Sequence, residues 1–262
     1  MKAQAILEHA QQTPQGRARI ALITALADIP GWYDPFTPEP ASTDFTTQQE
    51  NQFQWERDFY LVQFEIRADQ EMIVGGNPSW NTGVNYRKQL ERSIDLREVR
   101  ALYQQAGLSL NADLNALAIV PHIKADPQAV DHLSHFIIFN GNLEMPVLTL
   151  HTTGDGLVVP QSESAYASVV RWAGNSSLLR ELFTHRAYHC AFTSAEMLTA
   201  FHTLIQRVDT GTWGDSTDPV LLNQQAMAMG PALNTLVGEH LPPAFSAFTP
   251  TRFLRPFDVR NL

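Results

Sequence analysis

Residues 146–160 read Pro-Val-Leu-Thr-Leu-His-Thr-Thr-Gly-Asp-Gly-Leu-Val-Val-Pro, and they carry the clearest indication of the fold class. Its first six residues are mostly apolar or β-branched and are bounded by proline and glycine, which predicts a short buried strand over 146–151. A turn around Asp155 follows directly. Residues 162–172 then have helical character and stop before Gly174, a residue type typical of the end of a helix.

The same alternation is repeated downstream. Leu178–Phe183 has the composition of a second strand. Thr193 and Glu196 have the spacing of a capping box, which predicts a helix continuing to Ile205. Residues 146–208 therefore read strand, helix, strand, helix, an order that predicts a parallel sheet with helices packed on its faces.

The residues before this segment are mostly helical in pattern. Thr13 as N-cap and Pro14 at the first helical position predict a helix that ends before Pro30. The closely spaced prolines of 30–40 predict a connector without regular structure. Helical patterns return over 48–108, with an interruption at residues 75–78, and again in a short segment after Pro127.

The tail, 209–262, is rich in Pro, Phe and Thr and has one clear helical patch, over 220–229. Aromatic side chains are frequent in the helical part of the chain. They are either ordinary core residues or the lining of a substrate pocket. The candidates for the lining are Trp55, Phe59, Tyr60, Trp80 and Tyr86.

Composition excludes several kinds of partner. With 18 Lys and Arg against 27 Asp and Glu, the net charge is −9, so we expect no nucleic acid partner. The longest apolar runs are far shorter than the roughly 20 residues needed to cross a bilayer, so we expect no membrane span. The single cysteine, Cys190, excludes an intrachain disulfide and a thiolate-rich zinc site. We expect no cofactor.

Two titratable residues follow the two predicted strands. Asp155 comes just after the first strand, and His189 comes just after the second. Because ligand and catalytic sites of open α/β sheets form at the carboxyl ends of the strands, neighbouring parallel strands would bring these side chains together. The carboxylate would then fix one imidazole nitrogen and leave the other free as a general base.

Residues 146–160 and the segment His189-Cys190-Ala191-Phe192 resemble the α/β-hydrolase superfamily. In that family the catalytic acid follows a strand in a Gly-Asp turn, and the catalytic base lies in a loop before the last helix. The resemblance implies the C-terminal part of an α/β-hydrolase fold with a mostly helical cap, and it implies that Asp155 and His189 are catalytic. Tyr188 departs from the pattern, because glycine is common at that position.

The nucleophile of this family lies in a Gly-x-Ser-x-Gly turn that precedes the acid and the base in the chain. This sequence contains no such turn. The strands that would feed the turn and the oxyanion hole are also missing before Thr13. The resemblance therefore implies either a fragment, inactive alone, or an N-terminal partner chain that carries the nucleophile.

The boundaries that follow are 1–33 for a helix of the main hydrolase domain, 34–142 for the helical cap, 143–210 for the last strands and helices, and 211–262 for a C-terminal extension. The implied function is a serine-type hydrolase of a small-molecule ester or related acyl substrate. The alternative is a non-catalytic binding or interaction module with an α/β-hydrolase-like fold.

Other chemically capable residues have simpler interpretations. His151 and His185 are expected to be structural or to support the base, and Cys190 to be a packed thiol. His132 and His135 have the spacing of two metal ligands but lack an evident third, so solvated or capping roles are expected. The two acids Glu163 and Glu181 are most simply surface charges.

Overall fold

The computed structural model describes residues 2–136 and 138–255, and its description excludes the side chains of residues 2, 3 and 60–64. The chain forms two compact units. The first comprises Met1–Gly31, Pro40–Phe139 and Phe253–Leu262, and the second comprises Trp32–Glu39 and Asn140–Arg252. Each unit is therefore assembled from segments that are far apart in the sequence.

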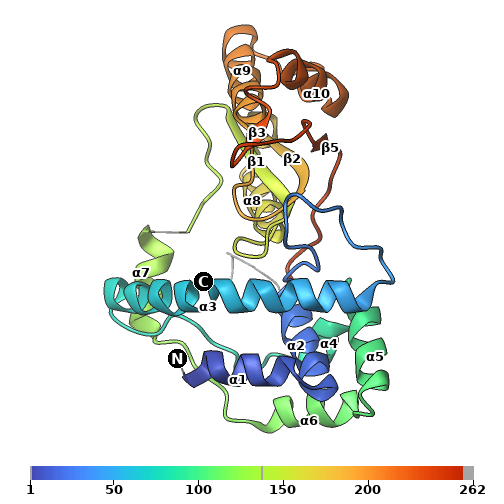
Figure 1. The fold of residues 1–262 in the computed structure, drawn as a ribbon. Helices are drawn as coiled ribbons and strands as arrows, with labels where there is room; N and C mark the ends of the chain where they lie inside the picture. The colour runs from blue at the N-terminus through green and yellow to red at the C-terminus, as the bar shows by residue number, and fades with distance from the viewer. Residues whose placement is uncertain (1, 137, 256–262) are drawn as a thin grey trace. The chain divides into compact units, whose positions relative to one another are not determined.

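The first unit is helical throughout its described elements. These are α1 (Lys2–Gln11), α2 (Pro14–Leu26), α3 (Phe45–Val74), α4 (Tyr86–Leu90), α5 (Leu96–Gln105), α6 (Leu110–Ile119) and α7 (Pro127–Phe136). The long helix α3 packs against α1, α2 and α5 (Figure 1). Buried apolar side chains from α2, α4, α5 and α6 form one core, with Tyr103 and Leu90 among its largest members.

Local sequence signals place the ends of these helices. The Thr13 hydroxyl accepts the N–H of Gly16, and Pro14 occupies the first turn of α2, which confirms the predicted start of that helix. The helix α3 ends at Gly75, whose φ of 79° is the left-handed conformation that glycine adopts without strain. No described helix carries an apolar stretch long enough to cross a membrane.

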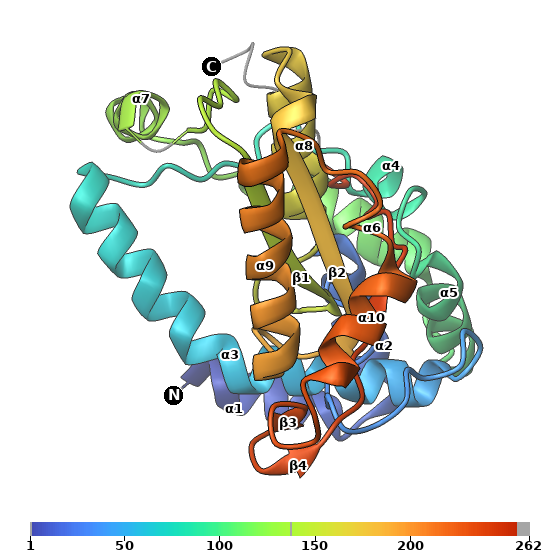
Figure 2. The same cartoon turned by 90° about the horizontal axis from the view of Figure 1, so that it is seen from above.

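The second unit is built on a small sheet. Strands β1 (Val147–Gly154) and β2 (Leu179–Ala187) are parallel, with Val147 opposite Leu179 and Thr152 opposite Thr184. Strand β5 (Phe245–Ser246) adds to the other edge of β2 in the antiparallel direction, giving the order β1-β2-β5. The parallel pairing predicted from the alternation of strands and helices is therefore confirmed, and Figure 2 shows β1 and β2 side by side.

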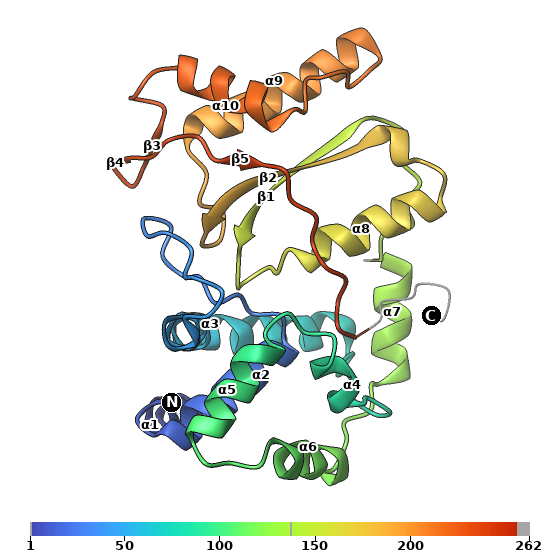
Figure 3. The ribbon, with the colours of Figure 1, turned by 90° about the vertical axis from the view of Figure 1, so that its right-hand side faces the viewer.

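Helices cover both faces of this sheet. Figure 3 shows α8 (Gln161–Trp172) on one face and α9 (Ser194–Thr210) with α10 (Pro219–Ala228) on the other. A short 3₁₀ turn, η1 (Ser176–Leu178), precedes β2, and a small hairpin joins β3 (Thr235–Leu236) to β4 (Glu239–His240). Leu182, Ala195, Leu222 and Phe245 belong to the core between the sheet and the α9–α10 layer.

The predicted strand Leu178–Phe183 is too short, because β2 continues to Ala187. The cause is Arg186, a charged residue that reads as loop in the sequence yet is 3% exposed in the fold. Its charge is matched by Glu196, whose carboxylate lies 2.7 Å from the guanidinium. A paired charge can occupy an interior strand position that an unpaired charge could not.

Candidate functional site

Asp155 lies in the turn directly after β1, and its side chain is 3% exposed. One carboxylate oxygen, Oδ1, accepts the backbone N–H groups of Leu157 and Val158 at 2.8 and 2.9 Å. These bonds close the turn and fix the carboxylate orientation. The second oxygen, Oδ2, is thereby left to face His189.

His189 lies in the loop between β2 and α9, residues 188–193, which we name the His189 loop. Its Nδ1 is 2.7 Å from Asp155 Oδ2, so Nδ1–H donates to the carboxylate. The imidazole is about one third exposed, whereas Asp155 is buried. The sheet thus brings together the two residues that were predicted to meet, in the geometry that leaves Nε2 unprotonated and able to accept a proton.

The His189 loop is joined to the end of β1 by two further bonds. The N–H of Tyr188 donates to Gly154 O at 3.1 Å, and the Thr152 hydroxyl donates to Tyr188 O at 2.7 Å. Thr152 is 1% exposed, so this second bond is inside the fold. The distance between acid and base is therefore set by backbone as well as by the two side chains.

The residues on either side of His189 have left-handed backbone conformations. Tyr188 has φ of 78° and Cys190 has φ of 54°, values that are costly for residues with a Cβ. The position of Tyr188 is the one where the family resemblance expects glycine, and the left-handed φ supplies the physical reason. The Tyr188 ring packs edge-on against Tyr33 at 5.5 Å.

Cys190 is not a packed thiol, and that prediction is wrong. The side chain is exposed, and Sγ lies 3.4 Å from His189 Nε2. Cys190 has a left-handed backbone, and its thiol lies within hydrogen-bonding distance of the imidazole nitrogen that does not face Asp155. The S–H group can therefore donate to Nε2, the atom that would receive a proton from a nucleophile.

Partial desolvation and the negative charge of Asp155 raise the pKa of the Cys190 thiol. Because the thiolate is the reactive form, we expect iodoacetamide at pH 7.5 to alkylate Cys190 more slowly than it alkylates glutathione. The rate should rise in Asp155→Asn, which removes the charge. Mass spectrometry of the intact chain follows both reactions. Alkylation faster than that of glutathione would show instead that His189 and Cys190 form an ion pair.

The remaining histidines lie elsewhere. His151 is 9% exposed, with Nδ1 at 2.8 Å from Thr152 O, and the His185 ring contacts the tilted Trp32 ring with centroids 5.0 Å apart. In the first unit, the His132 ring contacts Phe136, and His135 Nδ1 is 2.9 Å from Asp131 O. Among the residues that the structure describes, no three His, Cys, Asp or Glu side chains converge as metal ligands do.

Of the aromatic candidates for a pocket lining, Trp55 and Tyr86 belong to the interior of the first unit. Trp55 is 1% exposed and stacks on Phe59 at 5.1 Å, and Tyr86 packs against the core. Trp80 is exposed, with the Arg255 guanidinium 4.8 Å from its ring. The fifth candidate, Tyr60, lies outside the described side chains.

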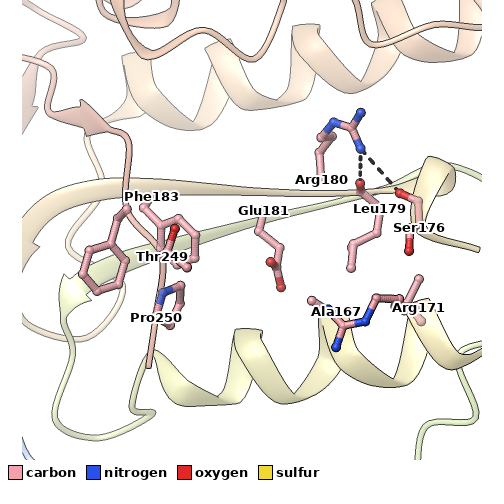
Figure 4. Close-up of a pocket in the computed structure, with 11 residues that line it drawn as sticks. Ala167, Arg171, Ser176, Leu179, Arg180, Glu181, Phe183, Thr249 and Pro250 are labelled. Carbon is pink, nitrogen blue, oxygen red and sulfur yellow. Dashed lines mark hydrogen bonds between the residues drawn. The ribbon is translucent and has the colours of Figure 1, made fainter. Parts of the chain in front are cut away.

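Glu163 and Glu181 are not surface charges, contrary to the prediction. Glu181 points from β2 toward α8, into a pocket of about 320 Å³ walled by Val170, Leu179 and Phe183 (Figure 4). Its Oε1 atom is buried without a hydrogen-bond partner in the described structure. Glu163 on α8 accepts the Thr149 hydroxyl at 2.7 Å. Strand periodicity explains the placement, because Glu181 lies between Leu179 and Phe183 on the α8-facing side of β2.

Burial and the nearby Glu163 carboxyl raise the pKa of Glu181 to about 8. The folded chain therefore keeps a proton that the unfolded chain loses above its ordinary pKa of 4.5. The stability contributed by this proton is present below pH 4.5 and is lost as the pH rises to about 8. We expect Glu181→Gln to melt at a higher temperature than the wild type at pH 8.5, with the difference shrinking toward pH 5.

Thermal unfolding of both proteins across this pH range measures the effect. The exposed Glu239→Gln, on β4, is the matched control and should leave the pH dependence unchanged. A melting-temperature difference that is the same at pH 5 and pH 8.5 would contradict the buried, protonated state of Glu181.

The chain is similar to an amidase. It is 32% identical over 231 residues to o-phthalyl amidase of Xanthobacter agilis, a match that covers 84% of this chain and 49% of that protein. The chain thus spans about half the length of this curated relative. No protein-family model and no solved structure matches it. The similarity supports a hydrolase, and it provides no support for a separate N-terminal chain as a partner.

Proposed function

We propose that this chain is the acid- and base-bearing part of a serine-type acyl hydrolase with an α/β-hydrolase fold. The observation that carries the proposal is the 2.7 Å contact between His189 Nδ1 and the buried Asp155 carboxylate, at the carboxyl ends of two parallel strands. The placement of α8 and α9 on opposite faces of these strands agrees with such a fold. Similarity to an amidase supports hydrolytic chemistry independently.

In this proposal His189 acts as the general base. Asp155 holds the Nδ1–H tautomer, so that Nε2 can take the proton of an attacking serine hydroxyl and later return it to the leaving group. The imidazolium formed between these steps is stabilised by the Asp155 carboxylate. The buried turn that fixes Asp155 with two backbone N–H groups keeps the carboxylate from rotating away.

The substrate that we propose is a small ester or amide with an aromatic acid portion. The name of the relative, o-phthalyl amidase, is the basis for including amides and an aromatic acid. The proposal keeps residues 143–210 as the last strands and helices of the hydrolase domain and 34–142 as a helical cap. Residues 1–33 and 211–262 would be a helix of the main domain and a C-terminal extension.

The proposal requires a nucleophile from outside these 262 residues, because they contain no Gly-x-Ser-x-Gly turn. That same absence favours the second candidate, a binding or interaction module that does no chemistry. An assembled hydrolase would cleave a hydrolysable substrate, whereas a binding module would bind it without cleavage. Adding a polypeptide that carries the nucleophile therefore distinguishes the two functions.

The test is co-expression of this chain with the part of o-phthalyl amidase that it does not match. We expect the purified assembly to hydrolyse a phthalyl amide and to react with a fluorophosphonate at a serine of the added part. The chain alone should do neither. His189→Gln should abolish hydrolysis. An assembly that keeps full activity with this change would contradict the proposal.

Two other outcomes are informative. Fluorophosphonate labelling of a serine in the chain alone would show that the nucleophile lies within it, and would overturn the requirement for an external one. A stable assembly that binds a phthalyl amide without cleaving it would favour the binding module.

A further inference from the structure

We infer that the buried ion pair of Arg186 and Glu196 is a positioning device that holds the His189 imidazole against Asp155. Its catalytic consequence rests on the proposed function, whereas its structural consequence can be measured without any substrate. The argument begins with where the two charges lie. Arg186 is the second-to-last residue of β2, and Glu196 is in the first turn of α9, so the pair spans the base of the His189 loop.

The two side chains are almost completely removed from solvent, at 4% and 0% exposure. The guanidinium makes two parallel bonds to the carboxylate, from Nη1 at 2.7 Å and from Nη2 at 3.0 Å. This two-pronged geometry fixes orientation as well as distance. A buried pair of this kind adds little net stability over a well-packed apolar pair, so a role in fixing one specific arrangement explains it better than a gain in stability.

The remaining bonds of the pair identify that arrangement. Arg186 Nη1 also donates to the backbone carbonyl of Ala191, two residues after His189, at 2.7 Å. Glu196 Oε2 accepts the N–H of Thr193 at 2.8 Å, which is the far end of the loop. One ion pair therefore holds the second half of the His189 loop at two points, Ala191 and Thr193.

The pair also connects the loop to a third segment. Arg186 Nη2 donates to Pro242 O at 3.1 Å, and the N–H of Ala244 donates to Glu196 Oε1 at 2.9 Å. The N–H of His185 donates to Ala244 O at 2.7 Å. Residues 242–244, which lead into β5, thus act as a fixed support behind the loop.

The loop needs such restraint because its backbone is strained. Tyr188 and Cys190, on either side of His189, both have the left-handed backbone conformation, which is strained for a residue other than glycine. A loop released at its base can relax these φ angles, and relaxation would rotate the imidazole away from Asp155. On the opposite side, Thr152 and Gly154 hold Tyr188, so the His189 loop is clamped from both directions.

The experiment is NMR of the ¹⁵N-histidine-labelled chain, which detects the His189 Nδ1 proton directly. We expect a protected Nδ1–H in the wild type. In Glu196→Gln, which keeps the shape and one acceptor oxygen but removes the charge, its exchange with solvent should be about 100-fold faster. Arg186→Lys, which keeps the charge but loses the two-pronged bond, should give a smaller acceleration.

The matched control is Trp213→Phe. Trp213 is buried in the same unit and donates to Ser177 O, and no hydrogen bond in the described part of the chain joins its side chain to the His189 loop. Its loss should therefore lower stability without changing Nδ1–H exchange. An Nδ1–H in folded Glu196→Gln that exchanges within about twofold of the Trp213→Phe rate would overturn the inference.

A wild-type measurement keeps the test decisive if a variant does not fold. The amide protons of Thr193 and Ala244 both donate to Glu196, so they report opening of the ion pair. We expect the His189 Nδ1 proton to exchange with the same urea dependence as these two amides. Rapid Nδ1–H exchange while both amides remain protected would show that the pair does not hold the imidazole.

These readouts separate the two proposals. If the Nδ1–H signal is lost in Glu196→Gln while the assembly with the wild-type chain is inactive, that result would support the positioning role and contradict the proposed hydrolase function. If the wild-type assembly is active but Glu196→Gln leaves Nδ1–H exchange unchanged, the hydrolase function is supported and the positioning role is contradicted. In an active assembly, the positioning role also predicts that Glu196→Gln lowers kcat with KM nearly unchanged.

Discussion

If the proposed hydrolase function holds, replacing Asp155 with Asn should lower the turnover of the assembled protein by about 10⁴-fold, the size of the loss when a triad aspartate in a serine protease is changed in the same way. The amide can present an N–H group to Nδ1, which favours the wrong imidazole tautomer and leaves Nε2 protonated. The two backbone N–H groups that bind Asp155 Oδ1 are still satisfied by the amide oxygen. Substrate binding should therefore change little.

Steady-state hydrolysis of a phthalyl amide by the co-expressed assembly measures this effect. Asp215→Asn is the matched control, because Asp215 is an exposed acid of the same unit and should leave turnover unchanged. A change in turnover of less than about tenfold for Asp155→Asn would contradict the proposed role of Asp155 as the triad acid.

Replacing Glu196 with Ala should destabilise the chain by about 3–5 kcal/mol, because it leaves the Arg186 guanidinium buried and unpaired. The same change removes the acceptor of the Thr193 and Ala244 amides and half of the capping box at the start of α9. A domain is typically stable by only about 5–15 kcal/mol, so the loss is a large fraction of the total. Urea denaturation followed by circular dichroism gives the value.

A second substitution, at Arg186, distinguishes the cost of a buried unpaired charge from the cost of lost packing. Adding Arg186→Met to Glu196→Ala removes the unpaired charge, so the double variant should recover part of the lost stability. If the two changes are additive instead, the cost of Glu196→Ala does not come from a stranded guanidinium. Glu239→Ala, at an exposed position, should be nearly neutral.

Local signals were sufficient to predict much of this fold. The capping box at Thr193 and Glu196 forms as expected, with both of its hydrogen bonds present, and the helix over 220–229 appears as α10. The order of strands and helices over 146–208 and the parallel pairing of the strands were also predictable. The same order predicts that Asp155 and His189 lie close together.

Elements that depend on partners distant in the sequence were not predictable. The strand β5 consists of two residues that pair with β2, too few to show a period of two. Glu181 reads as a surface charge because nothing in its neighbourhood reveals Glu163 and the α8-facing pocket. The exposed Cys190 thiol depends on left-handed backbone angles, and the sequence offers no glycine there to indicate them.

The discontinuous make-up of the two units limits how the chain can be divided. Trp32 and Tyr33 pack on His185 and Tyr188 of the second unit, although they precede most of the first unit in the sequence. Leu254 follows the second unit in the chain, yet its backbone is held by Asp28 and Arg92 of the first. A protease cut at 139–140 would therefore leave two polypeptides that each contain a piece of the other's unit. Such a nicked protein should remain associated, and expression plasmids that begin at residue 140 would lack the aromatic support of the His189 loop.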